Sequence, residues 1–224
     1  KTLPENNRQH CYPDFLVAFW MDQDGSLRIN WAEEQDLGIT TNLSLEGREY
    51  VKRVLENQKN PDSLWQISDE STSANYQFFL EPIISWTTGI NSVVASMPSL
   101  LGTPQQPWVA AIEFKFLSLM DHVVLPPGIG FAVVSNDTHQ VLFHSKERRN
   151  LREAFLVETD QNPKLRDLFA AKTAGHADGS YWGQPTSFYT LPLDPLPWAL
   201  VVYRDKEILR SVNLFGLLMA GGIY

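Results

Sequence analysis

The fold is decided by three consecutive segments, Trp108-Val-Ala-Ala-Ile-Glu-Phe-Lys-Phe116, Leu125-Pro-Pro-Gly128 and Ile129-Gly-Phe-Ala-Val-Val134. In the first segment every even position is apolar, and Glu113 and Lys115 face the other way, so this period of two predicts a strand. The adjacent prolines of the second segment cannot donate hydrogen bonds to a sheet. We therefore predict that one sheet ends here, that another begins at residue 129, and that the chain forms two small domains in tandem.

The second half begins with a predicted hairpin of residues 129–135 and 140–145, whose turn carries the side chains that stabilise tight turns. A helix from Pro163 to Lys172 follows, with its apolar residues on one face. The sequence then predicts a loop marked by Gly175 and Gly179 and three strands, which are Tyr181-Trp182, Ser187 to Leu191 and Trp198 to Tyr203.

The first half shows the same order of elements. Strands at residues 15–21 and 27–31 flank a turn, Asp22 to Gly25, in which Gly25 suits a positive φ and the carboxylates serve the turn. A helix through residues 50–55 is expected to be capped by Ser44 or Thr41. Loops over 63–75 and 81–91 and strands at 76–80, 92–97 and 108–116 follow. Two copies of one order, with helices beside antiparallel sheets, predict an α+β fold.

Composition and charge exclude several classes of protein. The chain has 224 residues, 43% hydrophobic and 12% aromatic, which excludes a wholly disordered chain and allows two domains. Its formal net charge is −8, and no Lys/Arg cluster of the kind that marks a nucleic-acid-binding face stands out, so we expect no nucleic-acid partner. Cys11 is the single cysteine, which excludes an internal disulfide.

The C-terminal residues 206–224 are predicted to form an exit helix that leads into the start of a transmembrane span. From Val212 onward the sequence carries no charge, but it is shorter than the ~20 apolar residues that a span needs. The frequent Gly and small residues favour a span over the alternative, a terminal core helix.

Several motifs resemble the double Cache domains, which are PAS-like sensors of bacterial membrane signalling proteins. Gly128 to Asn136, Val141 to Ser145 and Pro197 to Asp205 resemble strands of the membrane-proximal module, and Ser85-Trp-Thr-Thr-Gly89 resembles a loop of the distal module. The resemblance covers about residues 14–210. It implies two tandem PAS-like (Cache) modules, each a five-stranded antiparallel sheet with flanking helices. Their bounds would be 1–13 for the end of an N-terminal segment, 14–125 for the membrane-distal module and 126–205 for the membrane-proximal module.

The resemblance implies an extracytoplasmic ligand-sensing domain of a histidine kinase, nucleotide cyclase or chemoreceptor, held in the bacterial inner membrane by flanking spans. It implies a small-molecule ligand in the distal module, a homodimer of the full-length protein, and a signal sent through the C-terminal helix. Two features depart from the family. Little precedes Phe15, where the family has a long helix, and residues 64–69 lack the Arg and Tyr of the amino-acid-binding subset. We therefore expect no standard amino-acid ligand.

No motif for catalysis is evident. The five histidines do not share the spacings of zinc sites, and neither a nucleophile elbow nor a phosphate-cradling loop is present. We therefore expect no catalytic residues, no metal and no cofactor. A non-signalling solute-binding domain and an unrecognised soluble enzyme remain the alternatives.

A ligand pocket is suggested instead by aromatic and hydroxyl side chains, because such sites are mostly apolar with a few polar groups. In the distal module these candidates are Trp65, Ser68, Tyr76, Phe78, Trp86, Thr87 and Thr88. A second candidate pocket, in the proximal module, comprises His144, Tyr181, Trp182 and Tyr189. The alternative for both sets is a packed core without a cavity.

Overall fold

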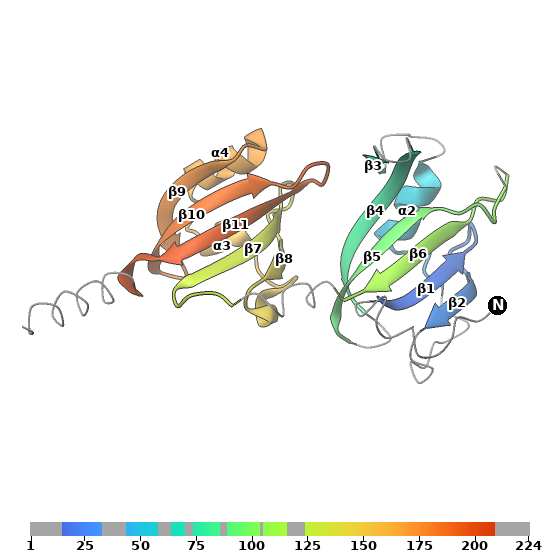
Figure 1. The fold of residues 1–224 in the computed structure, drawn as a ribbon, viewed down its shortest axis with the longest axis horizontal. Helices are drawn as coiled ribbons and strands as arrows, with labels where there is room; N and C mark the ends of the chain where they lie inside the picture. Colours follow the sequence, from blue (N-terminus) through green and yellow to red (C-terminus); the bar gives the residue numbers. More distant parts are fainter. Residues whose placement is uncertain are drawn as a thin grey trace, which may run out of the picture. The chain divides into compact units, whose positions relative to one another are not determined.

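The computed structural model describes residues 15–32, 44–57, 64–69, 74–85, 89–103, 105–115 and 124–208. The chain divides into two compact units, Lys1–Val123 and Val124–Tyr224, and each is built on one antiparallel sheet (Figure 1). The division falls two residues before Pro126, in the segment of sequence that separates the last strand of the first sheet from the first strand of the second.

The first unit contains a sheet of six strands in the order β2-β1-β6-β5-β4-β3. Its elements are β1 (Phe15–Met21), β2 (Leu27–Ala32), α2 (Glu49–Glu56), β3 (Trp65–Asp69), β4 (Ala74–Ile84), β5 (Asn91–Pro98) and β6 (Val109–Phe114). Helix α2 lies on the face formed by β4, β5 and β6 (Figure 1). It buries Tyr50, Val51 and Val54 there, so one helix and one sheet face enclose the core.

The N-terminus of α2 is held by a carboxylate from the sheet. The first N–H groups of a helix have no acceptor within the helix, and here the Tyr50 N–H donates to Glu81 Oε2 on β4 at 2.8 Å. The helix begins after Arg48, whose side chain makes no capping hydrogen bond. The prediction that Ser44 caps this helix is therefore wrong, and Thr41 lies outside the described residues. A tertiary contact replaces the local cap.

The second unit contains a sheet of five strands in the order β8-β7-β11-β10-β9. Its elements are β7 (Ile129–Ser135), β8 (Val141–His144), the 3₁₀ helix η4 (Glu147–Arg149), α3 (Phe155–Glu158), α4 (Pro163–Ala171), β9 (Gly175–Tyr181), β10 (Gln184–Pro192) and β11 (Trp198–Asp205). Figure 1 shows α3 and α4 together on one face of this sheet. We call this the inner face; its core includes Phe155, Leu165, Phe169 and Phe188.

The predicted fold class, α+β with two tandem antiparallel modules, is confirmed, with one additional strand in the first sheet. Strand β3 lies within residues 63–75, which we predicted as a loop, and β4 continues to Ile84, into the second predicted loop. Strand β3 is a short edge strand in which Trp65 and Ile67 alternate with Gln66 and Ser68, and it pairs with the first half of β4. This alternation over only five residues was overlooked within a polar segment.

The loop predicted around Gly175 and Gly179 is also wrong, because both residues lie within β9. A Cβ atom at Gly175 would lie 2.4 Å from the Leu168 side chain, and one at Gly179 would lie 2.4 Å from Asn162 Nδ2. These glycines let α4 approach the strand closely. They therefore serve helix–sheet packing rather than a turn.

The helix predicted near Asp205 begins at Lys206. Asp205 Oδ1 accepts from the Glu207 N–H at 2.8 Å and from the Ile208 N–H at 3.4 Å, which is the behaviour of an N-cap. Residues 209–224, where the span was predicted, lie outside the described residues. Within the described part of the chain, no helix has the length and apolar character required to cross a membrane.

The turn after β1 provides a test of the fold. Asp22 Oδ1 accepts from the N–H groups of Asp24 and Ser26, both at 3.0 Å, and Gly25 has a φ of +68°. A Cβ atom at Gly25 would lie 2.3 Å from the Glu46 nitrogen. We expect Gly25→Ala to lower the free energy of unfolding by about 1–3 kcal/mol, since a left-handed backbone and a close contact both oppose the methyl group.

The matched control is Gly47→Ala, because a Cβ atom added at Gly47 meets no atom within 4 Å. Gly47 is close to the same turn, two residues after Leu45, whose N–H donates to Gly25 O. Urea denaturation followed by tryptophan fluorescence compares the two variants. Equal unfolding midpoints would contradict the assignment of this turn.

Candidate functional site

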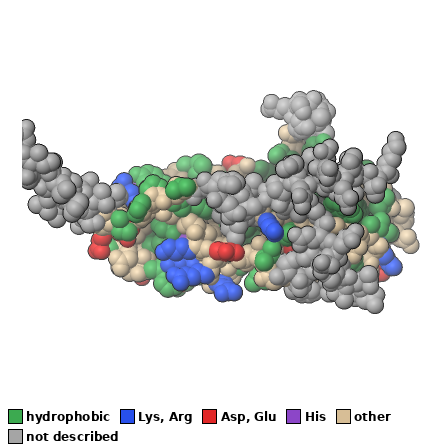
Figure 2. Space-filling view, turned by 60° about the horizontal axis from the view of Figure 1, so that its bottom comes forward, with side chains coloured by type: hydrophobic (Ala, Val, Ile, Leu, Met, Phe, Trp, Pro, Cys, Tyr) green, Lys and Arg blue, Asp and Glu red, His purple; other side chains and the backbone are tan. Residues whose placement is uncertain are grey.

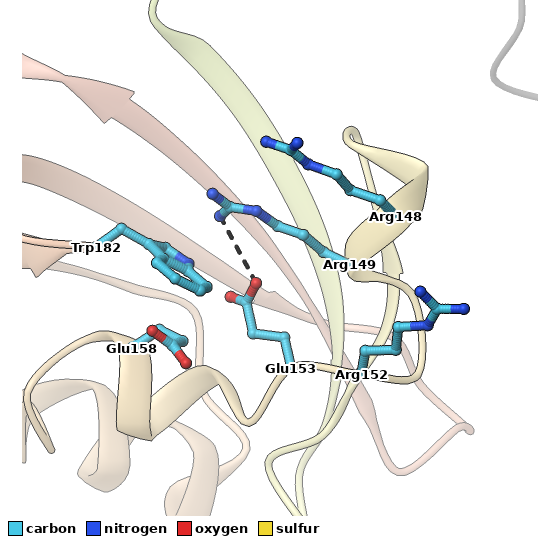
Figure 3. A pocket seen from close by; sticks show the side chains of 6 residues that line it. All are labelled: Arg148, Arg149, Arg152, Glu153, Glu158 and Trp182. Carbon is cyan, nitrogen blue, oxygen red and sulfur yellow. Dashed lines mark ion pairs between the residues drawn. The ribbon is translucent and has the colours of Figure 1, made fainter.

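A pocket of about 400 Å³ opens in the second unit (Figure 3). Its wall comes from η4 and the residues that follow it, from the end of α3, and from the turn between β9 and β10. The lining side chains are Arg148, Arg149, Arg152, Glu153, Glu158 and Trp182. This volume lies within the range of small-molecule sites.

The segment after β8 is held against the sheet, which brings Arg149 and Glu153 to the pocket. The buried Asn150 accepts the His144 N–H at its Oδ1, at 2.7 Å. The Val141 N–H donates to Glu153 O and the Leu151 N–H donates to Val141 O, both at 2.8 Å. These hydrogen bonds fix the backbone on both sides of the arginines, so the arginine side chains extend from a rigid segment.

Trp182 occupies an unusual position in the β9–β10 hairpin. Its φ is +53° and that of Gly183 is +76°, the pattern of a two-residue turn in which Asn-Gly is the preferred sequence. A bulky side chain in this region is strained. The Arg149 guanidinium lies 4.7 Å from the centre of the Trp182 ring, a cation–π contact. The hairpin therefore holds the backbone of Trp182 in a strained conformation, and the indole of Trp182 lines the pocket.

A buried carboxylate forms the floor of the pocket. Glu153 is 5% exposed, and its Oε1 accepts from the Tyr181 hydroxyl at 2.5 Å. Its Oε2 lies 3.6 Å from Arg149 Nη1 (Figure 3). Burial raises the pKa of Glu153, while the hydrogen bond from Tyr181, the charge of Arg149 and the indole of Trp182 act in the opposite direction.

Behind the carboxylate lies a buried hydrogen-bond network on the inner face. The Lys146 N–H donates to His144 Nδ1 at 2.7 Å, so the neutral ring carries its hydrogen on Nε2. His144 Nε2 lies 3.0 Å from the Tyr181 hydroxyl and 3.1 Å from that of Tyr203 on β11. Burial, followed by the charges of Arg149 and Lys146, lowers the pKa of His144 to about 3. His144 is therefore neutral at pH 7.

The structure brings together three of the four residues of the second candidate pocket. Trp182 lines the cavity, and Tyr181 and His144 stand directly behind it. Tyr189 does not join them. It lies on the other face of the sheet, 54% exposed, with its ring centre 4.9 Å from that of His176.

The described residues of the distal candidate set lie along the β3–β4 ribbon. Trp65 pairs with Phe78, with ring centres 6.1 Å apart, and the Ser68 hydroxyl donates to Asn75 Oδ1 at 2.6 Å on the exposed surface. Tyr76 is 45% exposed. Trp86, Thr87 and Thr88 lie outside the described residues. The distal pocket therefore stays a prediction.

Sequence analysis missed the charged residues of the observed pocket. Arg148, Arg149 and Arg152 fall within five residues of a chain whose net charge is −8, and this local excess was the available signal. Glu153 and Glu158 gave no signal, because a carboxylate's burial depends on tertiary contacts. In the part of the chain that the structure describes, no group of three His, Cys, Asp or Glu side chains could hold a metal ion.

No protein-family model matches this sequence, and no curated protein matches it either. Solved structures do match. The extracellular domain of a protein described as a histidine kinase, rpHK1S-Z16, has a TM-score of 0.62 at 15% identity, over 93% of this chain and 81% of that one. The ligand-binding domain of the Pseudomonas aeruginosa PAO1 chemoreceptor PctB, in complex with L-Gln, has a TM-score of 0.59 at 16% identity, over 93% and 77%.

The ligand-binding domain of the Pseudomonas fluorescens chemoreceptor CtaA, in complex with L-isoleucine, has a TM-score of 0.56 at 16% identity, over 88% of this chain and 72% of that one. At such identities these likenesses establish the fold alone. They confirm the fold inferred from the sequence, because each likeness covers 88–93% of this chain, and the neighbours are extracellular or ligand-binding domains of a protein described as a histidine kinase and of chemoreceptors.

The hydroxyl of Tyr181 can be tested without disturbing its ring. Tyr181→Phe removes the donor to the buried Glu153 and a partner of His144, so we expect the free energy of unfolding to fall by about 1–3 kcal/mol. Tyr189→Phe, on the exposed outer face, is the control and should change it by less than about 0.5 kcal/mol. Urea denaturation measures both. Similar losses in the two variants would argue against the network.

The lowered pKa of His144 makes a prediction about pH. Between pH 6.5 and about 3 the unfolded state binds a proton at this position that the native state does not, so stability falls as the pH falls through this window. The slope from this one group is up to about 1.4 kcal/mol per pH unit. We expect His144→Gln to show a shallower loss of stability between pH 6 and pH 4 than the unmodified protein, in urea denaturation at each pH. Parallel curves would contradict a buried neutral imidazole.

Proposed function

We propose that this chain is the extracytoplasmic ligand-sensing domain of a bacterial membrane signalling protein, such as a histidine kinase, a nucleotide cyclase or a chemoreceptor. The observation that carries the proposal is the connection between the pocket and the last strand. Tyr181 joins the pocket floor to the hydrogen-bond network, and Tyr203 joins that network to β11. Strand β11 ends at Asp205, which caps the helix that begins at Lys206.

The first residue of that helix is also tied to the sheet. Lys206 Nζ lies 2.8 Å from Asp178 Oδ1 on β9, and the Ser187 hydroxyl of β10 donates to the same atom at 2.7 Å. Lys206 and Ser187 are the main causes that lower the pKa of Asp178 to about 2, so this carboxylate is ionised at neutral pH. A displacement of β9, β10 or β11 therefore changes a contact at the start of the helix.

Ligand binding drives such a displacement only if the ligand binds one arrangement of these strands more tightly than the other. Packed interfaces respond in small discrete shifts, typically of 1–2 Å for a helix. We propose that the ligand is a small molecule, that the full-length protein is a homodimer anchored by flanking membrane spans, and that the helix from Lys206 carries the shift toward the membrane. We also propose that the domain is not an enzyme.

Two rival functions remain testable. A non-signalling solute-binding domain would bind a ligand without changing the start of the exit helix, and a soluble enzyme would turn over its ligand. The predicted distal site is part of the same question. If the distal module binds the ligand, Trp86→Ala should abolish binding.

The test starts with a thermal-shift screen of amino acids, organic acids and related metabolites against the 224-residue chain. A ligand at one hundred times its dissociation constant stabilises the protein by about 2.7 kcal/mol. The domain is then fused in place of the extracellular part of a chemoreceptor, and the receptor's kinase output is measured. We expect Asp178→Asn to leave ligand affinity unchanged and to reduce the ligand-dependent change in output.

Asp167→Asn, which alters an exposed carboxylate on α4, is the matched control and should respond as the unmodified domain does. A ligand that binds without any change in output would favour the solute-binding alternative. A screen without a single stabilising compound would contradict ligand sensing itself.

A further inference from the structure

The pocket of the second unit contains two arginines whose charges are not neutralised. Arg149 is paired with Glu153, but among the described residues neither Arg148 nor Arg152 makes an ion pair or side-chain hydrogen bond. Figure 3 shows Arg148 extending alongside Arg149, whereas the guanidinium of Arg152 points away from the other labelled side chains. An unpaired guanidinium at a pocket wall presents several N–H donors in a fixed planar arrangement that matches carboxylate and phosphate oxygens.

The charges of the lining favour an anion. The lining residues include three arginines and two glutamates, and Glu153 is already engaged by Tyr181 and Arg149. Glu158 is then the one lining carboxylate without an ion pair in the described part of the chain, against two free arginines. In a chain of net charge −8, this is a local reversal of sign. The space-filling view shows basic side chains gathered on one face (Figure 2).

Trp182 supplies the second recognition element. It is 53% exposed at the mouth, although its positive φ makes a bulky side chain costly and Asn would suit the turn better. A strained, exposed tryptophan beside free arginines is a flat apolar surface for the uncharged part of a ligand.

Resting on the proposed function, we infer that this pocket binds a small organic anion, with its carboxylate or phosphate group on Arg148 and its flat or apolar part on Trp182. Arg152 adds positive potential at the rim, and Glu158 limits the negative charge that the pocket accepts. An anion held there lies beside Arg149, whose partner Glu153 leads into the network that reaches β11. The second unit is on this account a binding module as well as a transmitting one.

The test uses isothermal titration of the 224-residue chain with three probes of similar shape. Benzoate carries a carboxylate, phenyl phosphate carries a phosphate, and benzamide is the neutral control. We expect saturable binding of at least one anion, about tenfold or more tighter than that of benzamide, and weaker at high salt. The stronger of the two anions identifies the group that Arg148 holds. No saturable binding by either anion, or equal binding of benzamide, overturns the inference.

Four variants make the test specific. Arg148→Gln should weaken anion binding about tenfold or more, and Arg204→Gln, an exposed arginine of β11 outside the pocket, should leave it unchanged. Glu158→Gln should strengthen anion binding, a direction that damage to the fold would not produce. Trp182→Asn provides the preferred turn residue, so it should weaken binding without lowering the unfolding midpoint.

Weaker binding in Glu158→Gln, or unchanged binding in Arg148→Gln, would overturn the inference. The failure of this inference is distinguishable from the failure of the proposed function. If another compound from the library stabilises the chain while both anions fail, ligand sensing stands and the anion site falls.

Discussion

The second unit depends on how it accommodates the buried carboxylate of Glu153. An ionised carboxylate away from water is costly unless hydrogen-bond donors and an opposite charge surround it. Tyr181 donates to one oxygen, and Arg149 lies near the other, which has no hydrogen-bond partner in the described structure. This requirement determines the surroundings. Tyr181 has to keep its hydroxyl on the inner face, and Arg149 has to stay at the pocket wall. His144 is neutral beside them for another reason, because burial and the charges of Arg149 and Lys146 lower its pKa.

The first unit accommodates its carboxylates with different partners. Glu81 accepts the Tyr50 N–H at the start of α2, and the buried Glu113 accepts the Ser92 hydroxyl at 2.7 Å. Here the half-buried Glu81 joins α2 to β4, and the buried Glu113 joins β6 to β5. In the second unit Glu153 instead joins Arg149, at the pocket wall, to the buried Tyr181. The two modules share a fold class, and this difference gives the second one a polar path from its surface to its sheet.

Several strands and helices were predictable from the sequence, β1 as a continuous apolar run and β6 as an alternation. The alternation of β6 did not predict its buried face, because Val109, Ala111 and Glu113 are buried and the apolar Ile112 is 45% exposed. Strand β9 left no such repeat, since its sequence is Gly-His-Ala-Asp-Gly-Ser-Tyr and pairing with β10 determines its structure. Of the second candidate set, Trp182 lines the observed pocket, and Tyr181 and His144 lie behind Glu153. Tyr189 lies on the outer face of the sheet, because successive side chains of a strand point to opposite faces. Ligand binding by these residues stays a prediction. The arginines were overlooked because their role depends on the neighbours that the fold supplies.

Gly130 explains why the connection between the pocket and the exit helix is direct. It pairs with Tyr203 across β7 and β11, and a Cβ atom there would lie 2.2 Å from the Tyr203 ring. Without that side chain the ring lies flat over β7, and its hydroxyl reaches both His144 and Ser145, the latter at 3.3 Å. Tyr203 precedes Asp205 by two residues, and a strand is nearly inextensible along its axis. If the Tyr203 hydroxyl shifts and the Tyr203 backbone moves with it, the strand between Tyr203 and Asp205 therefore passes the movement to the N-cap of the helix that begins at Lys206.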